Sequence, residues 1–216
     1  MAPKQSKVFI IDDDTALLES LSVLVQFVVG HVECYSSPSE FLTVVDSSCP
    51  ACVVTDLRMP GMTGLELQAA LTTRELQLPV IVLTGHGDVS AAVHAMKCGA
   101  VNFLEKSCPA EVLTNAIREA LELAHQRFCN WQQRRDFYQR LKLLTPAEQC
   151  VLAAMVRGRS NREIADAMDV SQRTVQFRRF SLLQKFGMVT REELMELVNK
   201  IAWTPKTTQP PAAEAQ

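Results

Sequence analysis

The sequence lacks the features of membrane-spanning, fibrous and disulfide-stabilised proteins. No apolar run approaches the roughly 20 residues that a membrane-spanning helix needs, and the polar segment Met1–Lys7 does not resemble a signal peptide. Only 8 glycines occur among the 216 residues, which excludes a collagen-like chain. We therefore expect a globular, cytoplasmic protein that does not cross a membrane.

Cysteine is present, but without a pattern that indicates a function. The seven cysteines are an odd number and lack the repeated spacing of a zinc site. Cys49 and Cys52 have the spacing of a redox motif, but they precede a predicted strand instead of opening a helix. We expect free thiols and neither a redox role nor a metal role for the cysteines.

The net charge of −2 conceals an asymmetry along the chain. Residues 1–125 contain 7 Lys and Arg against 15 Asp and Glu, whereas residues 126–216 contain 15 against 9. This difference indicates an acidic module joined to a basic one. The basic module is suited to a polyanion, and nucleic acid is the obvious candidate.

Five short apolar segments predict an α/β fold for the first part of the chain. Each is followed by a segment with helical periodicity, and they cover 8–11, 32–35, 52–55, 80–84 and 101–104. Strands without polar alternation are buried on both faces, as in a parallel sheet with helices on either side. Right-handed crossovers then give a doubly wound, flavodoxin-like fold, in which ligands bind at the carboxyl ends of the strands.

Helix signals complete this outline. Asp14 or Thr15 can cap the first helix, and Gly64, Asp88 and Pro109 open later ones. The part of the chain after Pro109 predicts one long helix or two abutting helices, apolar at first and then polar. We expect four parts: an α/β domain over 1–125, a helical linker over 126–143, an all-α domain over 144–203, and a disordered tail over 204–216.

Polar side chains stand at the carboxyl ends of four predicted strands. Asp12 and Asp13 follow the first strand, Asp56 and Thr84 end the third and fourth, and Lys106 follows the fifth. Carboxylate oxygens suit Mg²⁺, and an aspartate can attack phosphorus if cations and hydroxyl donors stabilise the phosphoryl oxygens. We predict Asp56 as the phosphoacceptor, Asp12 and Asp13 with Asp56 as ligands of Mg²⁺, and Thr84 and Lys106 as stabilising groups. Each residue alone has an ordinary explanation, such as a helix cap or a surface charge.

Around these residues the chain resembles the receiver domain of bacterial two-component response regulators. The resemblance covers about residues 5–125 and is closest at 56–68 and 84–106, which are similar to the FixJ-like branch. It implies that a sensor histidine kinase donates the phosphoryl group, and that Thr84 and an aromatic residue then move toward the site. Phe103 occupies the aromatic position. It has no hydroxyl and can signal only through packing, and it is equally well explained as a core residue.

One position departs from the receiver pattern. The family usually has a proline directly after the lysine, joined through a cis peptide, but here Ser107 follows Lys106 and proline comes only at Pro109. A cis Lys106–Ser107 bond costs about 2.5–4 kcal/mol. Either neighbouring contacts hold a cis bond, or the bond is trans and Lys106 approaches Asp56 differently.

The second domain carries the signals of a helix-turn-helix. Thr145 caps a helix, with Pro146 at its first position and Glu148 at the capping-box spacing. A short helix over 161–168, a two-residue turn and a longer helix over 171–186 follow.

The longer helix divides into two faces at about 100° per residue. Apolar residues form the core side, namely Val175, Leu182, Leu183 and Phe186. The other side carries groups that can contact base edges or thymine methyl groups, namely Arg173, Gln176, Phe177, Phe180 and Gln184. Alternatively, Phe177 or Phe180 packs on the first domain or the linker and does not contact DNA. Arg178 and Arg179 lie nearer the core side, where they can either contact a DNA phosphate or form an ion pair with Glu163.

Residues 144–197 resemble the LuxR/FixJ-type helix-turn-helix, most clearly at 144–148, 161–165 and 173–175. The resemblance implies binding to promoter DNA, and the predicted contact residues are Arg173, Thr174, Gln176, Phe177, Arg178, Arg179, Phe180 and Lys185. Phe177 and Arg178 differ from the residues common in the family, so base preference does not carry over. The last helix has an apolar stripe that either serves dimerisation, as in similar regulators, or completes the core: Leu194, Leu197, Val198 and Ile201.

These observations predict a phosphorylation-dependent transcriptional regulator and not an enzyme. The resemblance implies a homodimer on phosphorylation and activation of transcription through RNA polymerase. Two alternatives remain open. One is a constitutive DNA-binding protein whose receiver does not signal. The other is a haloacid-dehalogenase-type phosphatase, which residues 12–15 suggest but Ala16 disfavours.

Overall fold

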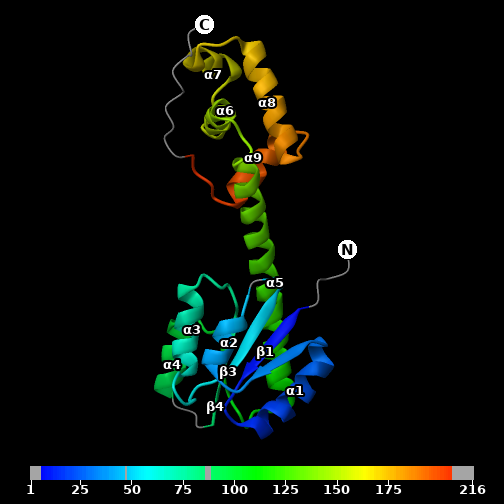
Figure 1. The fold of residues 1–216 in the computed structure, drawn as a ribbon, viewed down its shortest axis with the longest axis vertical. Helices are drawn as coiled ribbons and strands as arrows, with labels where there is room; N and C mark the ends of the chain where they lie inside the picture. The colour runs from blue at the N-terminus through cyan, green and yellow to red at the C-terminus, as the bar shows by residue number, and fades with distance from the viewer. Residues whose placement is uncertain (1–5, 47, 86–88, 206–216) are drawn as a thin grey trace. The chain divides into compact units, whose positions relative to one another are not determined.

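The computed structural model of the protein describes residues 6–46, 48–85 and 89–205 (Figure 1). The chain separates into two compact units, Met1–Cys129 and Asn130–Gln216. The predicted helix start at Asp88 lies outside the described residues, as does the predicted tail apart from Thr204 and Pro205.

The first unit contains a five-stranded parallel sheet. Its strands are β1 (Lys7–Ile11), β2 (Val32–Tyr35), β3 (Ala51–Asp56), β4 (Val80–Thr84) and β5 (Asn102–Glu105), in the order β2-β1-β3-β4-β5. Each matches its predicted segment to within one residue at either end. The register pairs Ile11 with Thr55 and Asp56 with Leu83, so the carboxyl ends of the central strands meet at one edge.

Helices cover both faces of this sheet, which confirms the predicted doubly wound fold. On one face lie α1 (Thr15–Val29) and the first half of α5 (Ala110–Leu141); on the other lie α2 (Pro38–Val44), α3 (Gly64–Thr73) and α4 (Val89–Lys97). Asp14, not Thr15, caps α1, because its carboxylate accepts from the backbone N–H groups of Ala16 and Leu17.

Burial follows position in the sheet. Every residue of β3 and of β4 is buried, and β1 is buried except at Lys7, as continuous apolar strands predict. β2 and β5 are partly exposed because each has a neighbouring strand on only one side. Fully burying one Val, Leu or Ile side chain contributes about 1.5–3 kcal/mol, so the central strands hold the unit together.

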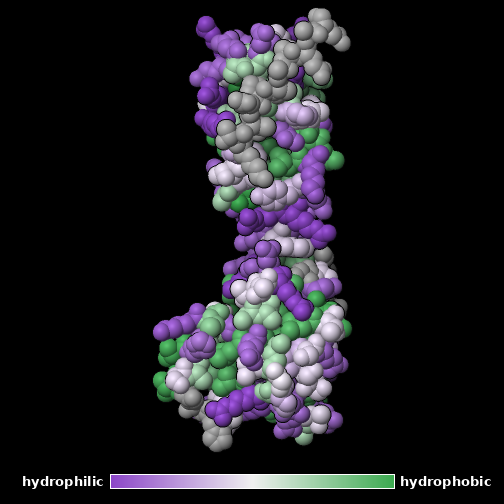
Figure 2. Space-filling model, turned by 60° about the vertical axis from the view of Figure 1, so that its left-hand side comes forward, coloured by the Kyte–Doolittle hydropathy of each residue, from purple (hydrophilic) through white to green (hydrophobic). Residues whose placement is uncertain are grey.

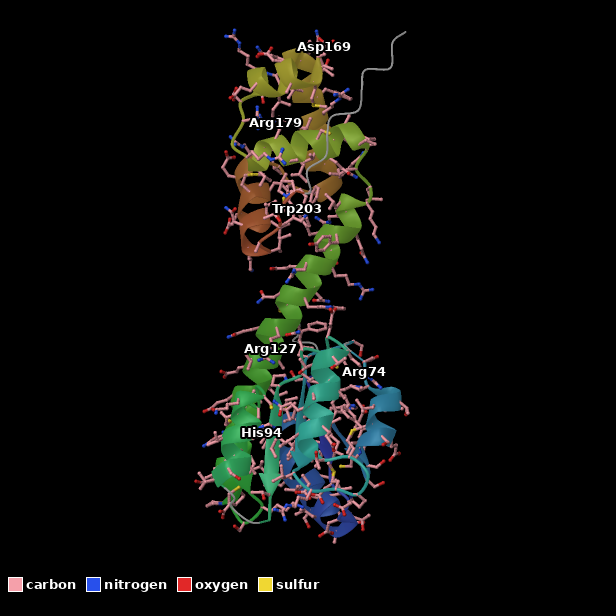
Figure 3. All side chains as sticks on the ribbon, turned by 90° about the vertical axis from the view of Figure 1, so that its left-hand side faces the viewer. Arg74, His94, Arg127, Asp169, Arg179 and Trp203 are labelled. Carbon is pink, nitrogen blue, oxygen red and sulfur yellow. The ribbon has the colours of Figure 1, made fainter. Side chains whose placement is uncertain are left out.

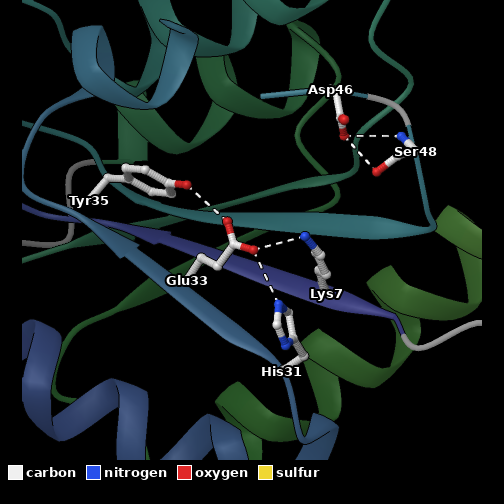
Figure 4. Close-up of polar contacts among 6 residues, drawn as sticks. All are labelled: Lys7, His31, Glu33, Tyr35, Asp46 and Ser48. Atoms are coloured by element: carbon white, nitrogen blue, oxygen red, sulfur yellow. Dashed lines mark hydrogen bonds and ion pairs between the residues drawn. The ribbon is translucent and has the colours of Figure 1, made fainter. Parts of the chain in front are cut away.

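A polar cluster lies on the β1–β2 side of the sheet (Figure 4). Glu33 accepts hydrogen bonds from Lys7 Nζ at 2.8 Å and from Tyr35 Oη at 2.9 Å, and it lies 3.1 Å from His31 Nε2. The hydrogen bond from Lys7 is the main cause that lowers the pKa of Glu33 to about 2, against the opposing effect of burial. Charged groups on an edge strand oppose pairing with strands of other chains.

The segment predicted as one long helix or two abutting helices forms one continuous helix of 32 residues, α5. Its last turns belong to the second unit. Phe137 is 1% exposed, and with Leu141 it packs in the core of that unit, although both fall in the segment predicted as a linker.

The second unit contains α6 (Pro146–Val156), α7 (Asn161–Met168), α8 (Gln172–Phe186) and α9 (Arg191–Lys200). Capping boxes start α6 and α7 at Thr145 and Ser160, and Ser171 caps α8. Asp169 and Gly187 end α7 and α8 in the left-handed conformation. The predicted short helix, tight turn and longer helix are therefore confirmed.

The apolar stripe of α9 completes the core of the second unit. Leu194, Val198 and Ile201 are at most 6% exposed and Leu197 is partly buried, and all four pack in the cluster that contains Phe137 and Phe186. Of the two roles predicted for this stripe, the structure supports the core role. A side chain already enclosed in its own unit has little surface left for a second copy.

Two predictions about the whole chain concern membranes and thiols. No helix in the described part of the chain is long and apolar enough to cross a bilayer. All seven cysteines are free thiols, as predicted. On the face shown in Figure 2, hydrophobic patches lie between hydrophilic side chains in both units.

Candidate functional site

Three carboxylates converge at the carboxyl edge of the sheet. Asp12, Asp13 and Asp56 each place one oxygen within 4.8 Å of the others. Asp12 is 1% exposed and Asp56 is 7% exposed, whereas Asp13 faces solvent. The structure thus brings together the predicted acidic group from two separate strands.

Local backbone geometry explains how these carboxylates are held. Oδ1 of Asp12 accepts from the Asp14 N–H at 2.9 Å, which fixes the turn between β1 and α1. A Cβ at Gly64 would lie 2.3 Å from the carbonyl oxygen of Asp56. Only glycine therefore allows α3 to begin so close to the end of β3, and this is the physical reason for the glycine predicted to open that helix.

Lys106, the residue directly after β5, joins the same group. Its Nζ lies 2.7 Å from Oδ2 of Asp12 and 3.2 Å from Oδ2 of Asp56. The Lys106 N–H donates to the carbonyl of Thr84 at 2.8 Å, which anchors the residue at the end of β4. The Lys106–Ser107 peptide is trans, since no cis bond occurs among the described residues. The trans alternative therefore holds, and it still brings the ammonium to both carboxylates.

The charges of this group are coupled. Burial raises the pKa of Asp56, and the hydrogen bond from Lys106 only partly offsets that effect. Burial acts to lower the pKa of Lys106, but its hydrogen bonds to Asp12 and Asp56 outweigh burial and raise it. Three carboxylates against one ammonium leave an excess of negative charge. The group can therefore hold a hard divalent cation through oxygen ligands.

Thr84 ends β4, and Phe103 lies on the neighbouring strand β5. Thr84 is 4% exposed at the end of β4, opposite Glu105 on β5. Phe103 lies two residues earlier on β5, so its side chain points to the same face of the sheet as that of Thr84. It is partly buried and packs against the apolar cluster beneath α3 and α4. This arrangement fits both roles predicted for Phe103, in the core and in signalling.

The second predicted site is the solvent side of α8. Arg173 and Gln176 are exposed, Phe177 is 71% exposed and Phe180 is 61% exposed. Val175, Leu182 and Phe186 are fully buried, as the predicted division into two faces requires. Two large aromatic side chains exposed beside cationic and amide groups form a surface suited to the DNA major groove.

Lys185 is a correction to the predicted DNA contacts. Its Nζ lies 2.6 Å from Oε2 of Glu148, which is 5% exposed and also accepts from Ser181 Oγ at 2.7 Å. Burial acts to raise the pKa of Glu148, but the hydrogen bonds from Lys185, Ser181 and Thr145 lower it to about 2. A helix-terminal lysine that neutralises a buried carboxylate serves the fold of its own unit. We therefore remove Lys185 from the set of DNA-contacting residues.

Arg179 also has an internal partner. It donates to Oδ1 of Asn161, while Glu163 closes the capping box with Ser160. The predicted alternative of an ion pair between Glu163 and Arg178 or Arg179 is not found in the described part of the chain. The role of Glu148 beyond its capping box was missed. The one signal for this role in the sequence was a basic residue, Lys185, on the side of α8 that borders the core.

Comparison with known families gives two matches that together cover most of the chain. Residues 8–118 match the response regulator receiver domain, and residues 142–198 match the bacterial regulatory proteins of the luxR family. The chain belongs to the response regulator family. The acidic group of the first unit and the exposed face of α8 fall within the two matched segments.

Curated relatives of this response regulator align with it over most of both chains. The response regulator protein TodT of Pseudomonas putida is 38% identical over 93% of this chain and 88% of its own. The transcriptional regulatory protein FixJ of Bradyrhizobium diazoefficiens is 35% identical over 88% of this chain and 93% of its own. The solved structure of the response regulator StyR is 34% identical, with a TM-score of 0.79 over 91% of this chain and 100% of that chain.

These relatives decide between the predicted classes of protein. The family consists of transcriptional regulators with a receiver and a DNA-binding domain, and it is not a family of enzymes. The phosphatase alternative is therefore not supported, and the protein is a DNA-binding transcriptional regulator.

Proposed function

We propose that phosphorylation of Asp56 controls DNA binding by the second unit, and that a sensor histidine kinase supplies the phosphoryl group. The observation that carries this proposal is the convergence of three carboxylates and the Lys106 ammonium at one edge of the sheet. Burying any one of these charges alone is costly. Together, the carboxylates can bind a metal ion and the ammonium can stabilise negative charge on the oxygens of a transferring phosphoryl group.

Each residue has a chemical role in this proposal. An oxygen of Asp56 attacks phosphorus while the bond from phosphorus to the donor nitrogen breaks, and an acyl phosphate forms. Lys106, already in contact with Asp56, offers its ammonium to the phosphoryl oxygens as the original ion pair is replaced. Thr84, at the end of β4, donates its hydroxyl to the same oxygens. Phe103 then moves toward the site with Thr84 and transmits the change through its packing contacts.

Asp12, Asp13 and Asp56 are the residues that would hold Mg²⁺. They offer hard oxygen atoms close enough to share one cation, and the exposed position of Asp13 leaves one side open to water. The bound ion would neutralise charge on the transferring phosphoryl group.

The output of the switch is DNA binding through α8. Gln176, Phe177 and Phe180 are proposed to contact the bases and Arg173 to contact the DNA with its guanidinium, on a phosphate or on a base edge, with Thr174 and Arg178 beside them on the flank of the helix. We further propose that phosphorylated receivers pair into a homodimer, that the pair binds two half-sites in promoter DNA, and that it activates RNA polymerase in the cytoplasm. The similarity to the transcriptional regulatory protein FixJ supports this output.

The test compares the native protein with Asp56→Asn. Both are incubated with acetyl phosphate and Mg²⁺, and intact mass and affinity for a promoter fragment are measured. The native protein should gain the mass of one phosphoryl group and bind DNA more tightly, whereas Asp56→Asn should do neither.

Glu105→Gln is a matched control, because Glu105 is exposed and lies one residue from Lys106. It should behave like the native protein. If Asp56→Asn binds promoter DNA as tightly as the phosphorylated native protein, the receiver does not signal and the DNA-binding unit is constitutive. If the native protein gains no mass, Asp56 is not a phosphoacceptor.

A further inference from the structure

Two helices of the first unit carry the same pairing of a histidine with a cysteine four residues later. On α5 the Cys129 sulfur lies 3.6 Å from Nε2 of His125, and on α4 the Cys98 sulfur lies 3.7 Å from Nε2 of His94. Figure 3 labels His94 on α4 and, on α5, Arg127, which follows His125 by two residues. Residues four apart are neighbours on a helix surface, so each pair presents a sulfur and a nitrogen to the same point.

The separation within each pair matches that of two ligands on one zinc ion. Zinc binds a cysteine sulfur at about 2.3 Å and a histidine nitrogen at about 2.0–2.1 Å, with tetrahedral angles. These values put the sulfur and the nitrogen about 3.6 Å apart, which is the separation found on α5. A hydrogen bond between the thiol and the imidazole holds this separation, so both groups already have the spacing that the metal requires.

The pair on α5 has a third ligand close in the sequence, and the pair on α4 does not. Glu122 stands three residues before His125, whereas Ala91 stands three residues before His94. The Glu-x-x-His spacing on one helix supplies metal ligands in the di-iron helix bundles. Glu122 does not lie within 4.8 Å of both other ligands. It is exposed and makes no ion pair among the described residues, so its side chain can rotate toward them.

The face of α5 that carries these groups is open to a cation. Glu122 and His125 are exposed and Cys129 is partly buried, so metal ions in solution can reach all three. Arg127 lies about 200° around the helix from His125, and it lines a separate cavity to which none of the three ligands belongs. Arg118 lies one turn before Glu122, on the side away from His125, and bonds to another side chain of α5.

We propose that Glu122, His125 and Cys129 bind one Zn²⁺ ion on the surface of α5, with water as the fourth ligand. A set of sulfur, nitrogen and oxygen donors suits zinc, whereas Mg²⁺ prefers oxygen alone. The Cys129 thiol releases its proton to solvent when its sulfur binds the metal. The ion joins two turns of α5 at the end of the first unit and stabilises the helix there.

This site goes against the sequence-based prediction that no cysteine has a metal role. That prediction considered the spacing between cysteines, whereas this site needs a single cysteine beside a histidine and a glutamate. The inference does not depend on phosphorylation of Asp56.

The experiment titrates Co²⁺ into the reduced full-length protein, with Mg²⁺ in excess to occupy the acidic group. Co²⁺ takes the coordination of zinc and absorbs light. A thiolate ligand gives a sulfur-to-cobalt charge-transfer band in the near ultraviolet, and a tetrahedral site gives strong visible bands. The native protein should show both, and Zn²⁺ should abolish them by displacing the cobalt. Absence of the charge-transfer band in a large excess of Co²⁺ would overturn the proposal.

Variants identify the ligands. Cys129→Ser should remove the charge-transfer band. His125→Ala and Glu122→Gln should each weaken Co²⁺ binding at least about tenfold, because losing even a partner of a metal ligand costs about 10–100-fold. Cys98→Ser, in the pair without a carboxylate, should keep both the band and the affinity. A band that survives Cys129→Ser or disappears in Cys98→Ser would refute the assignment, and so would native affinity in Glu122→Gln.

Thiol alkylation provides a second measurement with zinc itself. The protein is treated with iodoacetamide with and without Zn²⁺, and each cysteine is followed by peptide mass spectrometry. Zn²⁺ should slow alkylation of Cys129 strongly and of Cys98 only weakly, and it should leave Cys34, which is exposed on β2, unchanged. Glu122→Gln should reduce the protection of Cys129 to that of Cys98. Equal protection of Cys98 and Cys129 in the native protein would show that Glu122 is not a ligand and would overturn the proposed site.

Discussion

The Nζ of Lys106 lies 3.2 Å from Oδ2 of Asp56, although β5 and β3 are not neighbours in the sheet. The lysine reaches past the end of β4 while the peptide that follows it is trans. Contact between the two charges therefore depends on the length of the lysine side chain and on the Thr84 carbonyl that holds its backbone. A proline after the lysine is not needed for this contact.

Lys106→Met should remove acetyl-phosphate-driven DNA binding while leaving the fold intact. The variant lacks the ammonium that would meet the phosphoryl oxygens, but Met keeps the length of the stem. It should also bind Mg²⁺ more tightly than the native protein, because the carboxylates lose the cation that competes for them. Mg²⁺ titration and DNA binding are the two measurements. Lys97→Met, at the exposed end of α4, is the control and should behave like the native protein. If Lys106→Met is still activated by acetyl phosphate, Lys106 has no role in the phosphorylation site.

Glu148→Gln should destabilise the second unit by about 2 kcal/mol at pH 7, because the ion pair is lost and the Lys185 ammonium is left without its counter-charge. The folded pKa of Glu148, about 2, lies below its ordinary value of 4.5. Its contribution is therefore complete above pH 4.5 and is lost as the pH falls from 4.5 toward 2. Urea unfolding at several pH values should show that Glu148→Gln is less sensitive to acid than the native protein over this range.

Glu163→Gln provides the comparison for Glu148, since both residues close a capping box. Glu163 is exposed, and within the part of the chain that the structure describes its carboxylate bonds only to Ser160, so its replacement should cost much less. Equal losses in the two variants would show that the cap, and not the contact with Lys185 and Ser181, gives Glu148 its effect.

Arg173→Gln and Lys185→Gln should differ in the salt dependence of DNA binding. If the exposed Arg173 contacts phosphate, its loss lowers the slope of log K against log salt by about 1. Lys185 is already paired with Glu148, so Lys185→Gln should leave the slope unchanged. The slope can be measured on any duplex because phosphate contacts do not depend on sequence. A lower slope for Lys185→Gln would restore that lysine to the DNA-contacting set.

Phe177→Ala should remove a preference for thymine over uracil. If the exposed ring of Phe177 contacts a thymine methyl group, the native protein should bind an A·T-rich duplex about fourfold more tightly than its uracil-substituted counterpart, for each methyl group contacted. Phe177→Ala should bind both duplexes equally. Phe27, which is 88% exposed on α1, offers Phe27→Ala as a control that keeps the preference. A native protein indifferent to the methyl group would contradict this contact.

Much of the fold and the site could be predicted because the relevant signals are local. Continuous apolar runs fixed the five strands, and caps such as Thr145 and Ser171 fixed the helix starts. A parallel sheet brings the carboxyl ends of its strands to one edge, so Asp12 and Asp56 had to approach each other once the strands were known. The buried and exposed faces of α8 followed from helical periodicity alone.

The remaining features depend on distances between segments far apart in the sequence. The isomer of the Lys106–Ser107 bond is set by contacts around the loop, not by the two residue types, so both alternatives were open. Lys185 had a basic side chain and a helix-terminal position, which suit DNA as well as they suit a carboxylate. Only the packing of α6 against α8 placed Glu148 within 2.6 Å of it.

The sequence by itself determined which elements form, and at which edge of the sheet the acidic residues gather, because hydrophobic periodicity and strand direction are properties of short segments. The tertiary structure alone decided which charges are already paired. Ion pairs arise from side chains on separate elements, and their distances exist only after those elements have packed.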